Sequence, residues 1–188
     1  MLIGLRCPSD PCPAAPASGP VVSLLLECHT RIRRFTAMAA RLAQALDAPP
    51  AQVAEAAAQL RRYFATALPL HVADEDGTVL PRLLAVGPGP EVSEALEHME
   101  REHRHIDALL PPQLLAWATL QEEPARLPSL APSLTRGARV LGEAMARHLE
   151  REEQVILPAV ERLLPRALQD AMVAEMRARR AVDAGGAR

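Results

Sequence analysis

Two segments of the sequence place a histidine, a glutamate and a proline at the same intervals. Residues 71–81 read HVADEDGTVLP and residues 148–158 read HLEREEQVILP, so in both a Glu follows the His by four residues and a Pro follows it by ten. Positions four apart lie on one face of an α-helix, and each segment therefore directs an imidazole and a carboxylate to the same point. The pattern predicts a metal site with ligands from His71, Glu75, His148 and Glu152.

The composition favours an all-helical protein. Apolar residues make up 49% of the 188 residues and aromatic residues only 2%, while the good helix formers Ala, Leu, Arg, Glu and Gln are abundant. This length suits one domain with a sizeable core. The net charge of -2 gives no electrostatic support for binding nucleic acid or an anionic membrane. No apolar run reaches the length of about 18 residues that spans a bilayer, so no membrane partner is expected.

The first 20 residues are rich in Pro and Gly and are predicted to form a flexible N-terminal arm. This arm lacks the apolar core of a signal peptide, and three cysteines do not make a disulfide framework at this length. We therefore expect a cytoplasmic protein. For Cys7 and Cys12 the simplest interpretation is two unpaired thiols, and a metal-binding or redox-sensing pair is the alternative.

Apolar residues recur at intervals of three and four in four long segments, which predicts four helices. They cover residues 21–46, a segment from 51 that weakens at Gly77 and Pro81, a segment from 91, and residues 133–164. The segments 47–50, 87–90 and 122–132 contain the prolines expected in connections. Such helices predict an up-down-up-down four-helix bundle over residues 21–164, followed by a short amphipathic helix and a tail over residues 165–188.

Two further histidines, His29 and His103, lie on the apolar stripes of the first and third helices. His29 precedes His71 by 42 residues and His103 precedes His148 by 45, so each helical hairpin supplies the same set of ligands. The two hairpins are therefore predicted to be related by a pseudo-twofold axis. The stripe of the second helix is predicted to be Val53, Ala57, Leu60, Phe64, Ala67 and His71.

The helical rise decides whether these histidines reach the same level. At about 1.5 Å per residue, His29 and His71 lie at nearly equal depth in the first hairpin. His103 and His148 do so only if the third helix continues about 15 residues beyond His103. The sequence therefore predicts that Pro111 and Pro112 kink the third helix without ending it.

Four imidazoles and two carboxylates at one level form a candidate site for two metal ions. Burying two carboxylates without a compensating cation is costly, which argues against a purely structural His/Glu network. Six ligands exceed the four that a structural zinc ion takes. Carboxylates and imidazoles suit a pair of iron or manganese ions in a bundle core, with zinc a further occupant that the sequence leaves open. The predicted ligands are His29, His71, Glu75, His103, His148 and Glu152.

Three motifs, PLHVADED at 69–76, EHRHI at 102–106 and the segment at 148–158, resemble those of the hemerythrin-like (HHE cation-binding) family. The resemblance extends from about residue 21 to residue 164. It implies a bundle around a non-haem di-iron centre, with bridging Glu75 and Glu152. It also implies that His29 and His71 bind one iron and that His103 and His148 bind the other.

The sequence departs from the oxygen-carrying members of that family. Those have five histidines, two of them four residues apart on the third helix, whereas Met99 and Asp107 stand four residues from His103 here. A set of four His and two Glu is closer to iron-sensing and iron–sulfur-centre-repair proteins. The resemblance implies reaction with oxygen, nitric oxide or peroxide in sensing, scavenging or repair. A di-iron enzyme that reduces peroxide or nitric oxide, and a metal-free interaction bundle, are the alternatives.

Other polar residues near the ligands have less specific interpretations. Glu27 and Glu102 could orient an imidazole or pass protons, and a solvated side chain is the simpler interpretation of each. Asp107 could be an oxygen ligand or a partner of one, and Cys28 is expected to pack between helices without binding metal. Expected on the surface are His98, His105, Asp74, Arg177, Arg179 and Arg180.

Overall fold

The computed structural model describes residues 18–186, and their side chains up to residue 181. The predicted N-terminal arm, with Cys7 and Cys12, lies outside this part of the chain except for residues 18–20. Every element within 18–186 is helical, as the composition predicts. Within the same range, no helix combines the length and hydropathy that crossing a bilayer requires.

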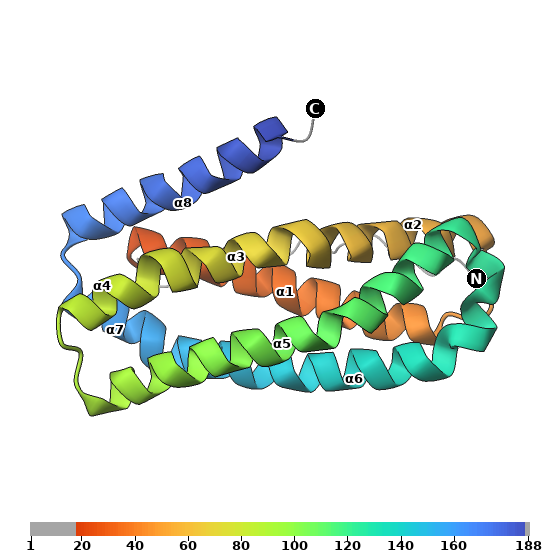
Figure 1. Cartoon of the computed structure of the whole chain (residues 1–188), viewed down its shortest axis with the longest axis horizontal. Coiled ribbons are helices and arrows are strands. Elements are labelled where there is room, and N and C mark those ends of the chain that lie inside the picture. The colour runs from red at the N-terminus through yellow and green to blue at the C-terminus, as the bar shows by residue number, and fades with distance from the viewer. Residues whose placement is uncertain (1–17, 187–188) are drawn as a thin grey trace.

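Four long helical segments lie side by side, as Figure 1 shows. Contacts join the first to the second, the second to the third, the third to the fourth and the fourth to the first, which closes the bundle. The predicted all-α four-helix bundle is confirmed. The first segment is α1 (Pro20–Gln44) and the third is α5 (Pro90–Glu122). The second comprises α2 (Pro50–Arg62), η1 (Tyr63–Ala67), α3 (Leu68–Asp74), η2 (Glu75–Val79) and α4 (Leu80–Ala85). The fourth comprises η3 (Pro124–Arg126), α6 (Leu127–Arg151), η4 (Glu152–Ile156) and α7 (Leu157–Leu163).

Proline positions set several of the helix boundaries. The helices α1, α2 and α5 begin at Pro20, Pro50 and Pro90, where the missing N–H would have had no partner in any case. The predicted break between the second and third segments contains Gly87 with φ 63° and Gly89 with φ 89°. These are left-handed backbone values that glycine adopts without strain. The glycines therefore allow the turn, and Pro90 starts the next helix.

The third helix continues through its two prolines. The helix α5 spans 33 residues and includes Pro111 and Pro112 in its interior. The continuation that brings His103 and His148 to one level is therefore confirmed. Figure 1 shows the direction of α5 changing along its length, which is consistent with the hydrogen bonds that prolines remove from a helix.

The prediction of a loop over residues 122–132 is wrong. The connection is short: η3 starts at Pro124 and α6 starts at Leu127, six residues before the predicted start of the fourth helix. Pro124 and Pro128 fall in first turns, where proline is tolerated. Pro132 lies inside α6 but near its start. Proline content alone therefore does not indicate a loop here.

Three turns of the second and fourth segments are π-helical, and each ends immediately before a Leu-Pro pair. In each case the Leu N–H bonds to the carbonyl five residues earlier, at Tyr63, Glu75 and Glu152. A proline can neither bond to nor easily approach the carbonyl four residues before it, and that carbonyl lies within the π turn. The wider turn explains why the helices continue past Leu80-Pro81 and Leu157-Pro158. Both η2 and η4 start at a predicted glutamate ligand.

The last helix, α8 (Arg166–Gly186), lies outside the four-helix square. It folds back along the bundle and contacts α1, α3 and η2. A short helix followed by a tail was predicted over residues 165–188, and in the structure the helix continues to Gly186.

The apolar core is divided into two clusters, and the predicted ligands lie between them. Each long segment contributes to one cluster on one side of its ligands and to the other cluster on the other side. The polar layer is therefore covered by apolar side chains in both directions along the bundle axis. The flanking pairs are Leu25 and Ile32, Leu68 and Val79, Met99 and Ile106, and Met145 and Ile156.

Candidate metal centre

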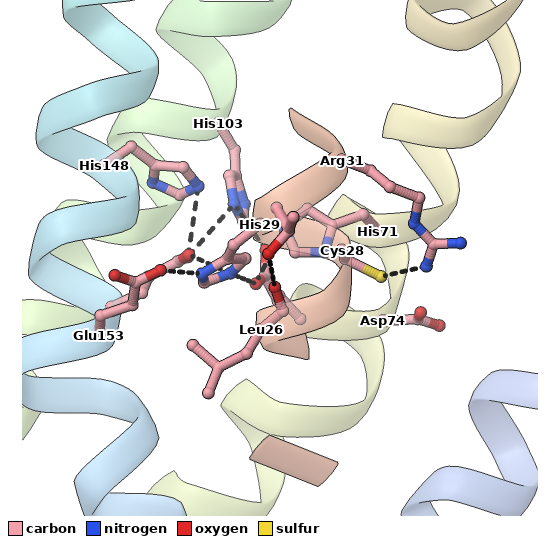
Figure 2. Close-up of polar contacts among 12 residues, drawn as sticks. Leu26, Cys28, His29, Arg31, His71, Asp74, His103, His148 and Glu153 are labelled. Carbon is pink, nitrogen blue, oxygen red and sulfur yellow. Dashed lines mark hydrogen bonds and ion pairs between the residues drawn. The ribbon is translucent and has the colours of Figure 1, made fainter. Parts of the chain in front are cut away.

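The six predicted ligands meet in the middle of the bundle. They come from α1, α3, η2, α5, α6 and η4, and none is more than 6% exposed. Figure 2 shows the four imidazoles converging from separate helical segments. They form two groups in which one ligand atom per residue lies within 4.8 Å of the others. The first group is His29, His71, Glu75 and Glu152, and the second is His103, His148, Glu75 and Glu152.

The two glutamates belong to both groups because each directs one oxygen toward each pair of histidines. Glu75 Oε1 lies 3.3 Å from His71 Nε2, and Glu75 Oε2 lies 3.2 Å from His103 Nε2. In the same way, Glu152 Oε2 lies 3.2 Å from His29 Nε2, and Glu152 Oε1 lies 3.2 Å from His148 Nε2. The arrangement is that of two carboxylates placed between two positions, each faced by two imidazoles.

The hydrogen bonds of these side chains leave their inward atoms unpaired. Nε2 of His29, His71 and His103 has no hydrogen-bond partner within the described residues, nor do Glu75 Oε2 and both Glu152 oxygens. Buried polar atoms without partners are costly, and cations bound between these atoms would remove that cost. The chemistry of the donor set, imidazole nitrogen with carboxylate oxygen, therefore fits two divalent metal ions.

The charges at the site depend on one another in the metal-free protein. Burial by itself lowers the pKa of His29, but the carboxylates of Glu152 and Glu75, 3.2 and 3.8 Å from its Nε2, outweigh it and raise the pKa to about 10. The pKa of His103 also rises to about 10, because Asp76 and Glu75 outweigh burial. His71 is different, since burial lowers its pKa to about 4. For Glu152, burial and the charge of Glu75 together raise the pKa.

Two carboxylates that were not predicted from the sequence form hydrogen bonds with the Nδ1 atoms of histidines, on the side of the ring away from the site. Glu153 Oε1 accepts a hydrogen bond from Nδ1 of His29 at 2.8 Å, and Asp76 Oδ1 accepts one from Nδ1 of His103 at 2.9 Å. An ionised carboxylate only accepts, so Nδ1 carries the proton and Nε2 faces the site. The signal was present in the repeat: in both copies an acidic residue follows the ligand glutamate directly.

Glu102 orients a third histidine. Its Oε2 accepts a hydrogen bond from Nδ1 of His148 at 3.3 Å, and its Oε1 pairs with Arg151. Although burial opposes the change, His148 and Arg151 lower the pKa of Glu102 to about 2. Of the two interpretations made from the sequence, the structure favours the orienting role. Glu27, by contrast, is exposed, as the simpler interpretation predicts.

The remaining neighbours mostly lie where they were predicted. His105 is exposed and the side chain of His98 is 38% exposed. Cys28 is buried and unpaired, and its sulfur accepts a hydrogen bond from Arg31 at 3.3 Å, as Figure 2 shows. Asp107 is exposed and belongs to neither four-ligand group. The interpretation of Asp107 as an oxygen ligand is therefore not supported.

Asp74 was predicted on the surface, and that prediction is wrong. Its carboxylate is fully buried and forms ion pairs with Arg179 and Arg180 of α8, which were themselves predicted to be solvated. Burial raises the pKa of Asp74 even though both arginines act to lower it. Arg177, two residues before Arg179, is exposed as predicted. The ion pairs of Asp74 with Arg179 and Arg180 connect α8 to the helical segment that carries His71 and Glu75.

Comparison with known families agrees with this geometry. The family model described as the Hemerythrin HHE cation binding domain matches residues 21–179, which includes every predicted ligand and most of α8. No curated protein and no solved structure matches the chain significantly. The family match covers most of the sequence, and the buried His/Glu groups agree with the cation binding that the family description states. The chain therefore belongs to the hemerythrin HHE cation-binding family.

Proposed function

We propose that this cation-binding protein holds two iron ions between its four long helical segments. The iron ions would bind or react with a small oxidising molecule: oxygen, nitric oxide or peroxide. The observation that carries the proposal is the placement of Glu75 and Glu152. Each has one oxygen 3.2–3.3 Å from a histidine of the first pair and the other oxygen at that distance from the second pair.

The residues divide naturally between the two ions. His29 and His71 would hold one, His103 and His148 the other, and both glutamates would bridge. When bound, a pair of iron ions supplies one-electron redox chemistry and positions to which a small molecule can add. With two imidazoles and two carboxylate oxygens each, the protein provides four ligand atoms per ion, which is fewer than the six that iron often takes.

The surroundings limit what can reach the ions. All six ligands are at most 6% exposed, and apolar clusters cover the site along both directions of the bundle axis. Only a small ligand fits such a site without separating the helices. Glu153, Asp76 and Glu102 fix three imidazoles in the orientation that presents Nε2 inward. The chain has no fifth histidine in the position of the oxygen carriers, and we therefore propose sensing, scavenging or repair and not transport.

Stopped-flow spectra of the anaerobic iron-loaded protein, mixed separately with oxygen, nitric oxide and peroxide, test this function. We expect a fast spectral change with at least one of the three, and irreversible oxidation by oxygen. Repeated turnover in the presence of a reductant would instead identify an enzyme. A loaded protein that reacts with none of the three would contradict the proposal.

A further inference from the structure

The four histidines differ in what holds the nitrogen that points away from the site. Nδ1 of His29, His103 and His148 bonds to a carboxylate, at Glu153, Asp76 and Glu102 respectively. Nδ1 of His71 is buried and has no hydrogen-bond partner among the described residues, whose side chains extend to residue 181. In the pair His103 and His148, both imidazoles are therefore hydrogen-bonded to a carboxylate through Nδ1. In the pair His29 and His71, only His29 is.

The pseudo-twofold relation shows where the missing partner would be. Asp76 and Glu153 occupy equivalent places, each directly after a ligand glutamate, and each bonds to the first histidine of the other hairpin. Glu102 directly precedes His103 and bonds to His148. The residue that directly precedes His29 is Cys28, whose sulfur accepts a hydrogen bond from Arg31. A cysteine therefore stands where a carboxylate would have supported His71.

Carboxylate support changes how well an imidazole binds a metal. A carboxylate that accepts the Nδ1 proton fixes the tautomer and the ring orientation, and it makes Nε2 a better electron donor. Removing such a partner typically lowers metal affinity by about 10- to 100-fold. The two carboxylates that bridge the positions contribute to both alike, so they do not compensate for the difference.

We propose that the two metal positions are unequal, and that the position of His103 and His148 binds a divalent ion more tightly than the position of His29 and His71. This inference rests on the proposed two-ion site. Glu102 is the positioning residue that raises the affinity of the second position, because it orients His148. At the equivalent place in the first hairpin stands Cys28, which supplies no carboxylate to His71. The ion at His29 and His71 is then the first to be lost and the more readily exchanged of the two.

Anomalous diffraction from crystals of the full chain with Co(II) tests the inequality. At one equivalent of Co(II), we expect the anomalous peak chiefly between His103 and His148, and at two equivalents a peak at both positions. Equal peaks at one equivalent, or a stronger peak at His29 and His71, would overturn the inequality and leave the two-ion site standing. The absence of any peak at two equivalents would overturn both.

The variant Glu102→Gln tests whether Glu102 causes the difference in metal affinity between the two positions. It keeps the size of the side chain and a weaker acceptor, and we expect it to lower affinity at the His103 and His148 position by about 10- to 100-fold. The peaks at one equivalent should then become equal or reverse. Glu94→Gln is the matched control, since Glu94 also faces a histidine, His98, but on the surface. A folded Glu102→Gln protein with the wild-type ratio of peaks would overturn the assignment to Glu102.

Discussion

His29 and Glu153, 124 positions apart in the sequence, are joined by a hydrogen bond of 2.8 Å. The bond links the first long helix to the fourth and fixes the imidazole so that Nε2 faces the centre of the bundle. Glu153 also receives two hydrogen bonds from Arg33, at 2.8 and 2.9 Å. His29 is thereby linked through Glu153 to Arg33, whose side chain is half exposed. The same arrangement of histidine, glutamate and arginine recurs at His148 with Glu102 and Arg151.

Removal of either glutamate that the two four-residue groups share should weaken metal binding at both positions. Because Glu75 and Glu152 each face both histidine pairs, we expect Glu75→Ala and Glu152→Ala each to lower the affinity for both ions by more than about 10-fold. Metal analysis after anaerobic loading and desalting measures this. Glu150→Ala changes an exposed glutamate of the same helix and should retain the metal, as should His98→Ala and His105→Ala. Retention of both ions by either bridging variant would refute the bridging assignment.

Metal binding should release protons at neutral pH. The pKa values of His29 and His103 are raised to about 10 in the metal-free protein, so both imidazoles are charged at pH 7.5. A metal ion needs the unprotonated Nε2, and filling both positions should therefore release about two protons. Affinity then falls as the pH is lowered. Titration calorimetry in buffers with different ionisation enthalpies counts the protons, and a heat of binding that is independent of the buffer would contradict the expectation.

Loss of the arginines that pair with Asp74 should destabilise the fold. Arg179→Ala combined with Arg180→Ala leaves a buried carboxylate without its partners, and breaking a fully buried ion pair costs about 3–5 kcal/mol. The two arginines are 26% and 31% exposed, so we expect a smaller loss of about 2 kcal/mol in the free energy of unfolding.

Urea unfolding at neutral pH measures this loss. Arg177→Ala, on the exposed face of the same helix, is the control and should change stability by less than about 0.5 kcal/mol. Adding Asp74→Asn to the double variant should recover part of the loss, because no buried charge then remains. A double variant as stable as the wild type would show that α8 is not fastened by this contact.

The sequence was sufficient to predict which six side chains meet between the helices and insufficient for several of their neighbours. Four of the six predicted ligands follow from the repeated His-to-Glu interval of four residues, because residues four apart share a helix face. The other two, His29 and His103, follow from their places on apolar helix stripes. Asp74 was misplaced because its partners lie 105 and 106 positions later, on a helix whose docking face no local pattern indicates. Its position next to Glu75 also suggested the opposite face of the helix.

A π turn and the positions of three prolines account for two other differences. Ala67 was predicted on the buried stripe of the second helix but is exposed, because the π turn at Tyr63–Ala67 shifts the phase and buries Leu68 instead. A regular period of 3.6 residues cannot describe such a shift. The prolines at 124, 128 and 132 suggested a loop, although two of them occupy first turns in which a proline replaces an N–H that has no helical partner.

The number of iron ions held by each chain tests the central claim most directly. Metal-free protein is loaded with Fe(II) under anaerobic conditions, freed of unbound iron and analysed for iron and protein. The two groups that share Glu75 and Glu152 predict two iron ions per chain, and fewer than one when both glutamates are replaced by alanine. One iron or less in the wild-type chain, or two in the doubly substituted chain, would contradict a bridged two-iron site.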